Sequence, residues 1–164
     1  MSDAAITIRI IQADSEARAA AEIMAGTDPW ITLGRSAEQT YKNVSNPLNE
    51  SYVALAAPAR VVGIIVVSLP IPLVKGYIAA LAVHQDYRNR GVGAQLLAHA
   101  EKRIFQISPN VFLTVSSFNS GAQRFYYRHG YQLVGELKDY LIAGESELLL
   151  RKRVGPWSGF SATS

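Results

Sequence analysis

The sequence predicts an α/β protein, an α+β mixed sheet covered by helices, and two observations carry this prediction. Apolar residues alternate with polar ones, or recur at helical spacing, along most of the chain. Short turns that pair neighbouring strands stand beside helices long enough to cross over a sheet. The predicted order is β-α-α-β-β-β-α-β-α-β-β, with about seven strands and four helices. The chain of 164 residues shows no repeat and no linker, so we expect one domain over residues 1–153 and a tail over 154–164.

The N-terminal third predicts one strand and two helices. Residues 6–10 alternate apolar and polar side chains, which is typical of a half-buried strand. Asp14 is expected to cap a helix that ends at Gly26. Ser36 and Gln39 form a capping-box pattern that opens a short second helix. The apolar face of the first helix is expected at Ala19, Ala20, Ile23 and Met24.

The middle of the chain predicts four strands and one helix. The turn "APAR" joins the first two of these strands, which are therefore expected to pair antiparallel. The helix precedes the fourth strand and is indicated by apolar residues at helical spacing. We expect the strands at residues 52–56, 61–68, 77–83 and 111–116. The apolar residues of the helix are Val92, Leu96, Leu97, Ala100 and Ile104.

The last third predicts one helix and two strands. Ser120 and Gln123 form a second capping-box pattern, and the helix that they open ends at Gly130. The strands are expected at residues 131–137 and 146–153, separated by "KDYLIAGE". One face of the helix carries Ala122, Phe125, Tyr126 and His129.

The composition excludes several classes of protein and site. The net charge of +3 comes without a basic run, which argues against a nucleic-acid partner. Because the chain has no cysteine, disulfides, thiolate metal sites and a cysteine nucleophile are excluded. The three histidines show no metal-ligand spacing, so we expect no metal. The chain shows no signal-peptide pattern, and its longest apolar run is too short to span a bilayer. We therefore expect a cytoplasmic protein with no membrane partner.

The stretch "YRNRGVGAQLLAHAE", which begins at Tyr87, places arginines and glycines directly before a predicted helix. A helix N-terminus offers free N–H groups and a partial positive charge, and glycines let an anion approach them closely. The segment therefore predicts a phosphate site. Leu96 stands where a dinucleotide-binding fingerprint needs a small residue, and no Walker A ending follows. The alternative is a tight strand-to-helix turn with solvated arginines.

The segment "RNRGVG" is an Arg-x-x-Gly-x-Gly pattern after an apolar strand. It resembles the acetyl-CoA pyrophosphate motif of the GCN5-related N-acetyltransferase (GNAT) superfamily. The segment "SSFNSGAQRFYYRHGY" resembles the second signature of that family, and the two motifs lie in the family's order. The order of the elements also matches the family, although the N-terminal third matches by pattern alone. The resemblance therefore implies a GNAT-like acyl-CoA N-acyltransferase fold.

The resemblance also implies roles for particular residues. Asn119 would hydrogen-bond the pantetheine region, Phe125 would pack beside it, and Tyr126 would protonate the leaving thiolate of CoA. The alternatives are that Asn119 only caps a helix and that both aromatic residues belong to the core. The pantetheine arm and the thioester carbonyl would be held by the main chain of Leu81, Ala82 and Val83. The pyrophosphate would lie on the amides of Arg88, Asn89, Arg90, Gly91, Val92, Gly93 and Ala94.

The general base and the acceptor site have weaker signals in the sequence. The family often carries a glutamate base on or near its fourth strand, but "YIAALAVHQ" contains no carboxylate. A water relay to Tyr77, to a backbone carbonyl or to Glu136 is one alternative, and direct use of His84 or His129 is another. The acceptor site is expected between the N-terminal helices and the last hairpin. Candidates for its aromatic lining are Trp30, Tyr41, Tyr52, Tyr77 and Tyr140.

The resemblance implies an acetyl-CoA-dependent N-acetyltransferase that acts on a primary amine of a small molecule, peptide or protein. Because the chain has no cysteine, direct transfer in a ternary complex is the economical mechanism. The alternative is a non-catalytic acyl-CoA-binding or regulatory module of the same fold. A homodimer is also expected, because the apolar strand "ELLLR" and a tail with Trp157 and Phe160 would be partly exposed in a monomer.

Overall fold

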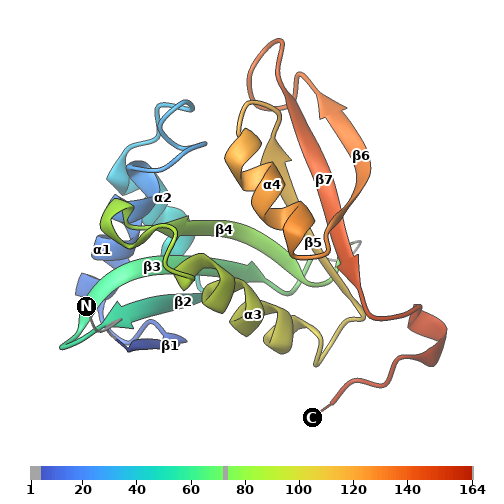
Figure 1. The fold of residues 1–164 in the computed structure, drawn as a ribbon, viewed down its shortest axis with the longest axis horizontal. Coiled ribbons are helices and arrows are strands. Elements are labelled where there is room, and N and C mark those ends of the chain that lie inside the picture. The colour runs from blue at the N-terminus through green and yellow to red at the C-terminus, as the bar shows by residue number, and fades with distance from the viewer. Residues whose placement is uncertain (1–4, 72–73, 164) are drawn as a thin grey trace.

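The computed structural model describes residues 5–71 and 74–163, which form a mixed β-sheet covered by helices on both faces (Figure 1). The strands are β1 (Ile6–Ile10), β2 (Asn49–Ala56), β3 (Arg60–Ser68), β4 (Tyr77–Val83), β5 (Asn110–Ser116), β6 (Gln132–Lys138) and β7 (Ser146–Arg153). The helices are α1 (Asp14–Ala25), α2 (Ala37–Val44), α3 (Val92–Ile104) and α4 (Ser120–Arg128), with short 3₁₀ turns η1 (Gln85–Tyr87) and η2 (Trp157–Gly159). The predicted element order and fold class are confirmed.

The seven strands lie in the order β1-β2-β3-β4-β5-β7-β6. Neighbouring strands are antiparallel, except that β4 and β5 run parallel. Two predicted strands, at residues 77–83 and 146–153, coincide with β4 and β7. The observed β2 begins at Asn49 rather than at Tyr52, because it continues to pair with the far end of β3.

Apolar side chains on both faces of the sheet explain why the central strands read as nearly continuous apolar runs. Along β3, Ile64 and Val66 belong to the cluster that packs against α1. Their neighbours Ile65 and Val67 belong to the opposite cluster, which contains the buried face of α3 and Tyr126 of α4. The predicted apolar face of α3 is buried at every position, as shown by Val92, Leu96, Leu97, Ala100 and Ile104.

The start of α1 differs from the prediction. Ala13, not Asp14, occupies the N-cap position and contributes no side-chain hydrogen bond. Asp14 is the first helical residue, and its carboxylate accepts hydrogen bonds from Arg18 and from the hydroxyl of Tyr41. An acidic residue in the first turn still stabilises the helix through its dipole. Ala19 is only partly buried, because the face that meets the sheet runs through Ala17, Ala20, Ala21, Ile23 and Met24.

The start of α4 also differs from the prediction, whereas α2 has the predicted capping box between Ser36 and Gln39. Asn119 caps α4, because its Oδ1 accepts a hydrogen bond from the backbone N–H of Ala122 at 3.3 Å. Ser120 is therefore the first residue of the helix. Gln123 donates to main-chain carbonyls of the preceding segment instead of closing a capping box.

The contact between β4 and β5 is short, and this shapes the centre of the molecule. The two strands pair only at Tyr77 with Phe112 and at Ile78 with Leu113. Beyond Ile78, β4 continues to Val83 with a partner on its β3 side alone. Figure 1 shows β5, β7 and β6 diverging from β1–β4 at this point, with α3 and α4 beside the gap. One edge of β4 is therefore left without a strand partner.

The C-terminal segment folds back on its own chain. The backbone N–H of Thr163 donates to the carbonyl of Gln106 at 2.9 Å. The ring of Trp157 packs against that of Phe160, with 5.5 Å between centroids, and Lys75 lies 5.6 Å from the Trp157 centroid. Residues of the tail thus contact the loop that follows α3.

Candidate functional site

The turn before α3 has the backbone geometry that the glycine-rich segment suggested. Gly91 is the N-cap of α3 and has a φ of +77°, a left-handed conformation that favours glycine. Asn89 is also left-handed, with a φ of +59°. Arg88 stabilises the turn from outside: its Nε donates to the carbonyl of Val83 at 3.1 Å, and its Nη2 to Oγ1 of Thr27 at 3.2 Å. The turn therefore presents free amides without a capping side chain.

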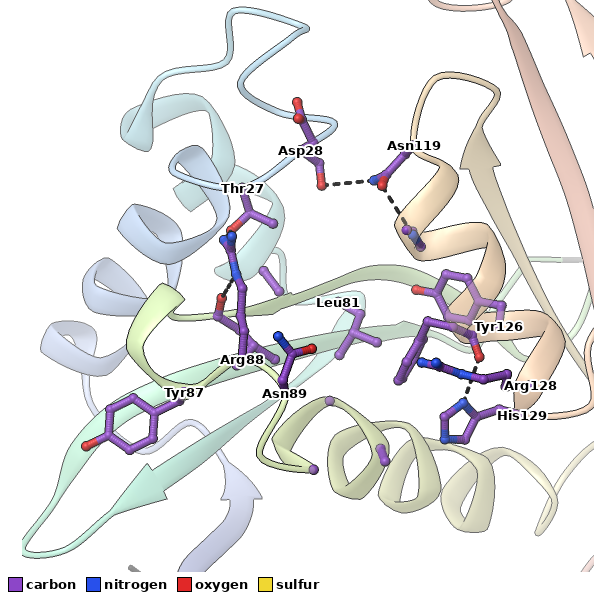
Figure 2. A pocket seen from close by; sticks show the side chains of 18 of the residues that line it. Thr27, Asp28, Leu81, Tyr87, Arg88, Asn89, Asn119, Tyr126, Arg128 and His129 are labelled. Carbon is purple, nitrogen blue, oxygen red and sulfur yellow. Dashed lines mark hydrogen bonds between the residues drawn. The ribbon is translucent and has the colours of Figure 1, made fainter. Parts of the chain in front are cut away.

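A cavity of about 740 Å³ lies between this turn, the end of β4, the loop after α1 and helix α4. Figure 2 shows Leu81, Asn89 and Tyr126 around it, with Arg88 on one side and Arg128 on the other. The cavity brings together most of the residues predicted for cofactor binding and catalysis. Its lining includes Leu81, Ala82, Val83, Arg88, Asn89, Gly91, Gly93, Ala94, Asn119, Phe125 and Tyr126.

Two predicted residues, Arg90 and Val92, do not line the cavity. The guanidinium carbon of Arg90 lies over the ring of Tyr87, 5.7 Å from its centroid. The side chain of Val92 is buried in the core, because it faces the sheet from the first turn of α3. Only their main-chain amides remain as candidate contacts of a phosphate.

The absence of a side chain at Gly93 keeps the cavity open. A Cβ atom at this position would lie 3.6 Å from the ring of Phe125 and 3.7 Å from Val83, both of which line the cavity. A larger side chain would fill the space between α3 and α4. This observation supports a ligand that passes between the two helices, as the pantetheine arm and pyrophosphate of acetyl-CoA would.

The sequence patterns missed part of the lining. Gly26, Thr27, Asp28 and Ile31 come from the loop after α1, and the end of α4 contributes Arg128 and His129. The loop has no motif of its own, and only the tertiary fold places it opposite α4. Asn119 connects the two, because its Nδ2 donates to the carbonyl of Asp28 at 3.4 Å while its Oδ1 caps α4 (Figure 2). Both polar atoms of this side chain thus have protein partners.

The electrostatics of the cavity favour an anion. Arg88 and Arg128 are among its lining residues, and the N-terminus of α3 adds a partial positive charge. The carboxylate of Asp28 is directed toward its own loop, where Oδ1 accepts from the backbone N–H and the hydroxyl of Thr32 at 3.2 and 2.7 Å. His129 is held by a 2.7 Å hydrogen bond from Nδ1 to the carbonyl of Phe125.

Tyr126 is the buried phenol of the site. Its ring packs against Phe125 and Tyr131, with 5.3 and 5.6 Å between centroids, and the residue is 8% exposed. Burial raises the pKa of Tyr126, and the nearby hydroxyl of Tyr77 raises this pKa further. Tyr126 therefore carries its proton at neutral pH.

A second cavity, of about 170 Å³, lies where β4 and β5 diverge. It is lined in part by Trp30, Leu33, Leu141 and the buried carboxylate of Glu147. The residues that line both cavities are Asp28, Leu81, Asn119, Ala122 and Tyr126. A group at the end of a ligand in the larger cavity would therefore meet a second ligand beside Tyr126.

Of the aromatic residues proposed for the acceptor site, Trp30 lines the second cavity. Tyr41 instead binds Asp14 of α1, and Tyr52 packs on the opposite face against His99. Tyr77 connects β4 to β5 through a 2.9 Å hydrogen bond between its hydroxyl and Oγ1 of Thr114. Tyr140 is 63% exposed in the β6–β7 connection. Neither Tyr41 nor Tyr52 lines either cavity.

The proposed bases are also dispersed. Glu136 is exposed on β6, where it accepts a hydrogen bond from the hydroxyl of Ser146. His84 follows β4, but its Nδ1 accepts from the backbone N–H of Asp86, and it lies outside both cavities. His129 lines the larger cavity only. None of the three lines the small cavity.

The described residues include neither a cluster of possible metal ligands nor a helix able to span a membrane. Across residues 5–71 and 74–163, no three histidine or acidic side chains are grouped closely enough to hold a metal ion. Within the same residues, the helices are too short or too polar to cross a membrane.

The chain is similar to known acetyltransferases. An uncharacterized N-acetyltransferase of Methanocaldococcus jannaschii is 38% identical over 96 residues, which cover 57% of this chain and 60% of the relative. The chain thus aligns with less than two thirds of the length of that relative. Two solved structures share the fold. One is a Desulfovibrio desulfuricans protein assigned to the GNAT family, with a TM-score of 0.77, 20% identity and coverage of 92% and 100% of the two chains.

The second structure is a protein described as a streptothricin acetyltransferase of Bacillus anthracis, in complex with acetyl coenzyme A. It has a TM-score of 0.61 and 24% identity, with 70% of this chain and 67% of that chain covered. The family described as the acetyltransferase (GNAT) family matches residues 17–131, which include both motifs, the turn before α3 and most of α1. This chain therefore belongs to the GNAT family of acetyltransferases.

Proposed function

We propose that the protein is an acetyl-CoA-dependent N-acetyltransferase that acts on a primary amine of a small molecule, peptide or protein. The observation that carries the proposal is the junction of the two cavities at Tyr126. The larger cavity suits a long anionic donor, and the smaller one suits a compact acceptor. Because the two ligands would meet beside a buried proton donor, transfer proceeds directly in a ternary complex.

The donor binds along the end of β4 and the turn before α3. The pyrophosphate lies on the backbone amides of residues 88–94; the amide of Arg88 also donates to the carbonyl of Gln85, whereas those of the first turn of α3 have no helical partner. The main chain of Leu81, Ala82 and Val83 holds the pantetheine arm, because the edge of β4 that faces β5 has no strand partner there. A free N–H of this edge polarises the thioester carbonyl and stabilises the negative charge that develops on its oxygen.

The reaction removes two protons from the acceptor nitrogen, and the protein or water carries them. The ammonium form of the acceptor loses one proton, and the neutral nitrogen forms a bond to the thioester carbonyl carbon. The carbon–sulfur bond then breaks, and its electron pair leaves with the sulfur. Tyr126 gives its hydroxyl proton to the sulfur and recovers a proton from the new amide nitrogen. The products are the acetylated amine, CoA thiol and one proton released to solvent.

The alternative function is acyl-CoA binding without turnover. A separate small cavity beside Tyr126 favours the enzyme, because a binding module needs no acceptor site. The test measures release of free CoA from acetyl-CoA over a panel of amines that includes polyamines, amino acids and peptides with free N-termini. Amine-dependent release supports the enzyme. Stabilisation by acetyl-CoA with no release from any amine would favour the binding module.

The assembly and location expected from the sequence stay predictions. The apolar strand β7 lies between β5 and β6, so the exposed apolar surface belongs to the edge strand β6 and the tail. We propose that two copies of the chain pair through this surface. Light scattering at micromolar concentration should give twice the chain mass of 17.9 kDa, and a particle of 17.9 kDa would exclude the dimer. The exposed residues are Leu133, Val134, Leu137 and Trp157.

A further inference from the structure

The small cavity contains a buried carboxylate that neither family motif includes. Glu147 lies on β7 and is 5% exposed, yet it lines the cavity together with Leu81 and Tyr126. The family match ends at residue 131, so Glu147 also lies outside the matched segment. Burying a carboxylate is costly unless a cation or several donors stabilise it. Glu147 therefore needs a cation or hydrogen-bond donors to stabilise its charge in this buried position.

The protein stabilises only one of the two oxygens of this carboxylate. Ser116 lies directly opposite Glu147 in the register of β5 and β7, and its hydroxyl donates to Oε1. The ion pairs of the described residues do not include Glu147. Every fully buried side-chain nitrogen or oxygen in that part of the chain has a hydrogen-bond partner. No hydrogen bond to the second oxygen, Oε2, is found among these residues, so Oε2 is not fully buried and is accessible from the cavity that Glu147 lines.

The other ionisable groups near this oxygen are exposed and directed elsewhere, or are uncharged. Asp28 also lines the cavity, but its side chain is exposed at the surface, and its carboxylate points toward Thr32 of its own loop and away from Asn119 and Tyr126 (Figure 2). Tyr77 is bound to Thr114, and burial raises the pKa of Tyr77 as well as that of Tyr126. Both phenols are therefore uncharged at neutral pH. Glu147 is the carboxylate that a cation entering this cavity would meet.

We propose that Glu147 binds the ammonium group of the acceptor and accepts the first proton from it; this rests on the proposed acetyl transfer. The cavity of about 170 Å³ with Trp30, Leu33 and Leu141 in its lining fits a compact apolar amine with a single positive charge. A polycation would place further charges against these apolar side chains. The acceptor class is therefore a monoamine head group, such as the first residue of a peptide or a small aliphatic amine.

The proton balance of this step is simple. One N–H bond of the ammonium breaks, and the proton forms an O–H bond on the Glu147 carboxylate, directly or through one water. The nitrogen keeps the electron pair and attacks the thioester carbon. After the acetylated amine leaves, Glu147 returns the proton to solvent. Tyr126 donates the separate proton that reaches the sulfur, so Glu147 and Tyr126 act on different protons.

The experiment compares wild type with Glu147→Gln, which keeps the shape of the side chain and removes its charge. On the best amine of the panel, kcat/KM should fall by about 10²-fold, with a raised KM for the amine and unchanged affinity for acetyl-CoA. A fluorinated analogue of that amine, whose nitrogen is largely unprotonated at neutral pH, should lose far less. This difference separates proton transfer from a structural role, which would slow both amines equally.

Glu145→Gln is the matched control. Glu145 also accepts a hydrogen bond from a serine hydroxyl, that of Ser117, but it lines neither cavity. The control should retain wild-type kinetics within about threefold. If Glu147→Gln turns over like wild type, or loses equally on both amines, the inference is overturned while the acetyl transfer stands. If wild type releases no CoA with any amine, the proposed function and the inference fall together.

A second variant covers the case in which Glu147→Gln no longer binds acetyl-CoA. Glu147→Asp keeps the charge and withdraws the carboxylate from the cavity by one methylene group. It should lose about tenfold or more on the parent amine and less on the fluorinated analogue, because proton transfer depends steeply on position. Unchanged turnover on both amines would overturn the assignment.

Discussion

The larger cavity takes about half of its lining from one continuous stretch of chain, residues 81–94, whereas the smaller cavity takes no more than a few residues from any one segment. The continuous stretch joins a strand end, a tight turn and a helix start, so its geometry depends mainly on local sequence. The smaller cavity needs the loop after α1, two diverging strands and β7 to come together. The turn proposed to hold the donor is thus encoded locally, whereas the rest of both cavities depends on the tertiary fold.

The largest effect is expected from a substitution in the turn before α3. Gly91→Glu places bulk and negative charge at the turn, and it should abolish the stabilisation by acetyl-CoA measured as a rise in melting temperature. A Cβ at Gly91 meets nothing nearer than Gln95 at 4.0 Å, but the φ of +77° strains any side chain. Gly91→Ala carries the same strain without the charge and should keep most of the affinity. Equal binding by Gly91→Glu and wild type would place the phosphate site elsewhere.

The next effect lies at the junction of the two cavities. Tyr126→Phe removes only the hydroxyl, so turnover should fall by about 10²-fold while acetyl-CoA affinity stays constant. The measurement is steady-state turnover at saturating donor, with affinity determined separately. Tyr127→Phe serves as the control, because this neighbouring tyrosine is 43% exposed and lines neither cavity. Lost affinity with unchanged turnover at saturation would make Tyr126 a packing residue.

The smallest effect is expected from a substitution in the small cavity, which tests whether the two cavities bind different ligands. Trp30 lines only the small cavity, so Trp30→Ala should raise KM for the amine by roughly tenfold, the value of one aromatic contact to a cation. The affinity for acetyl-CoA should not change. A variant that weakened the donor and left KM for the amine unaltered would show that the two cavities are not separate binding sites.

The two helix caps show where local sequence stops being decisive. Two helices each have two adjacent candidates for the N-cap position: Ala13 and Asp14 at α1, and Asn119 and Ser120 at α4. The backbone conformation selects the first residue of each pair. At α4, Asn119 also donates to the loop after α1, ninety-one residues away in the chain. Where no distant partner competed, as at Ser36 and Gln39, the capping pattern alone was sufficient.

The sequence by itself determined the element order, the helical face of α3 and the glycine turn, because periodicity and left-handed φ angles are properties of short segments. Only the tertiary structure decided that β7 lies between β5 and β6, which carries Glu147 to the side of Ser116. It also decided that β4 and β5 separate after two paired positions. Such arrangements depend on packing between residues far apart in the chain, and a carboxylate at residue 147 has no local feature that distinguishes it from an exposed one.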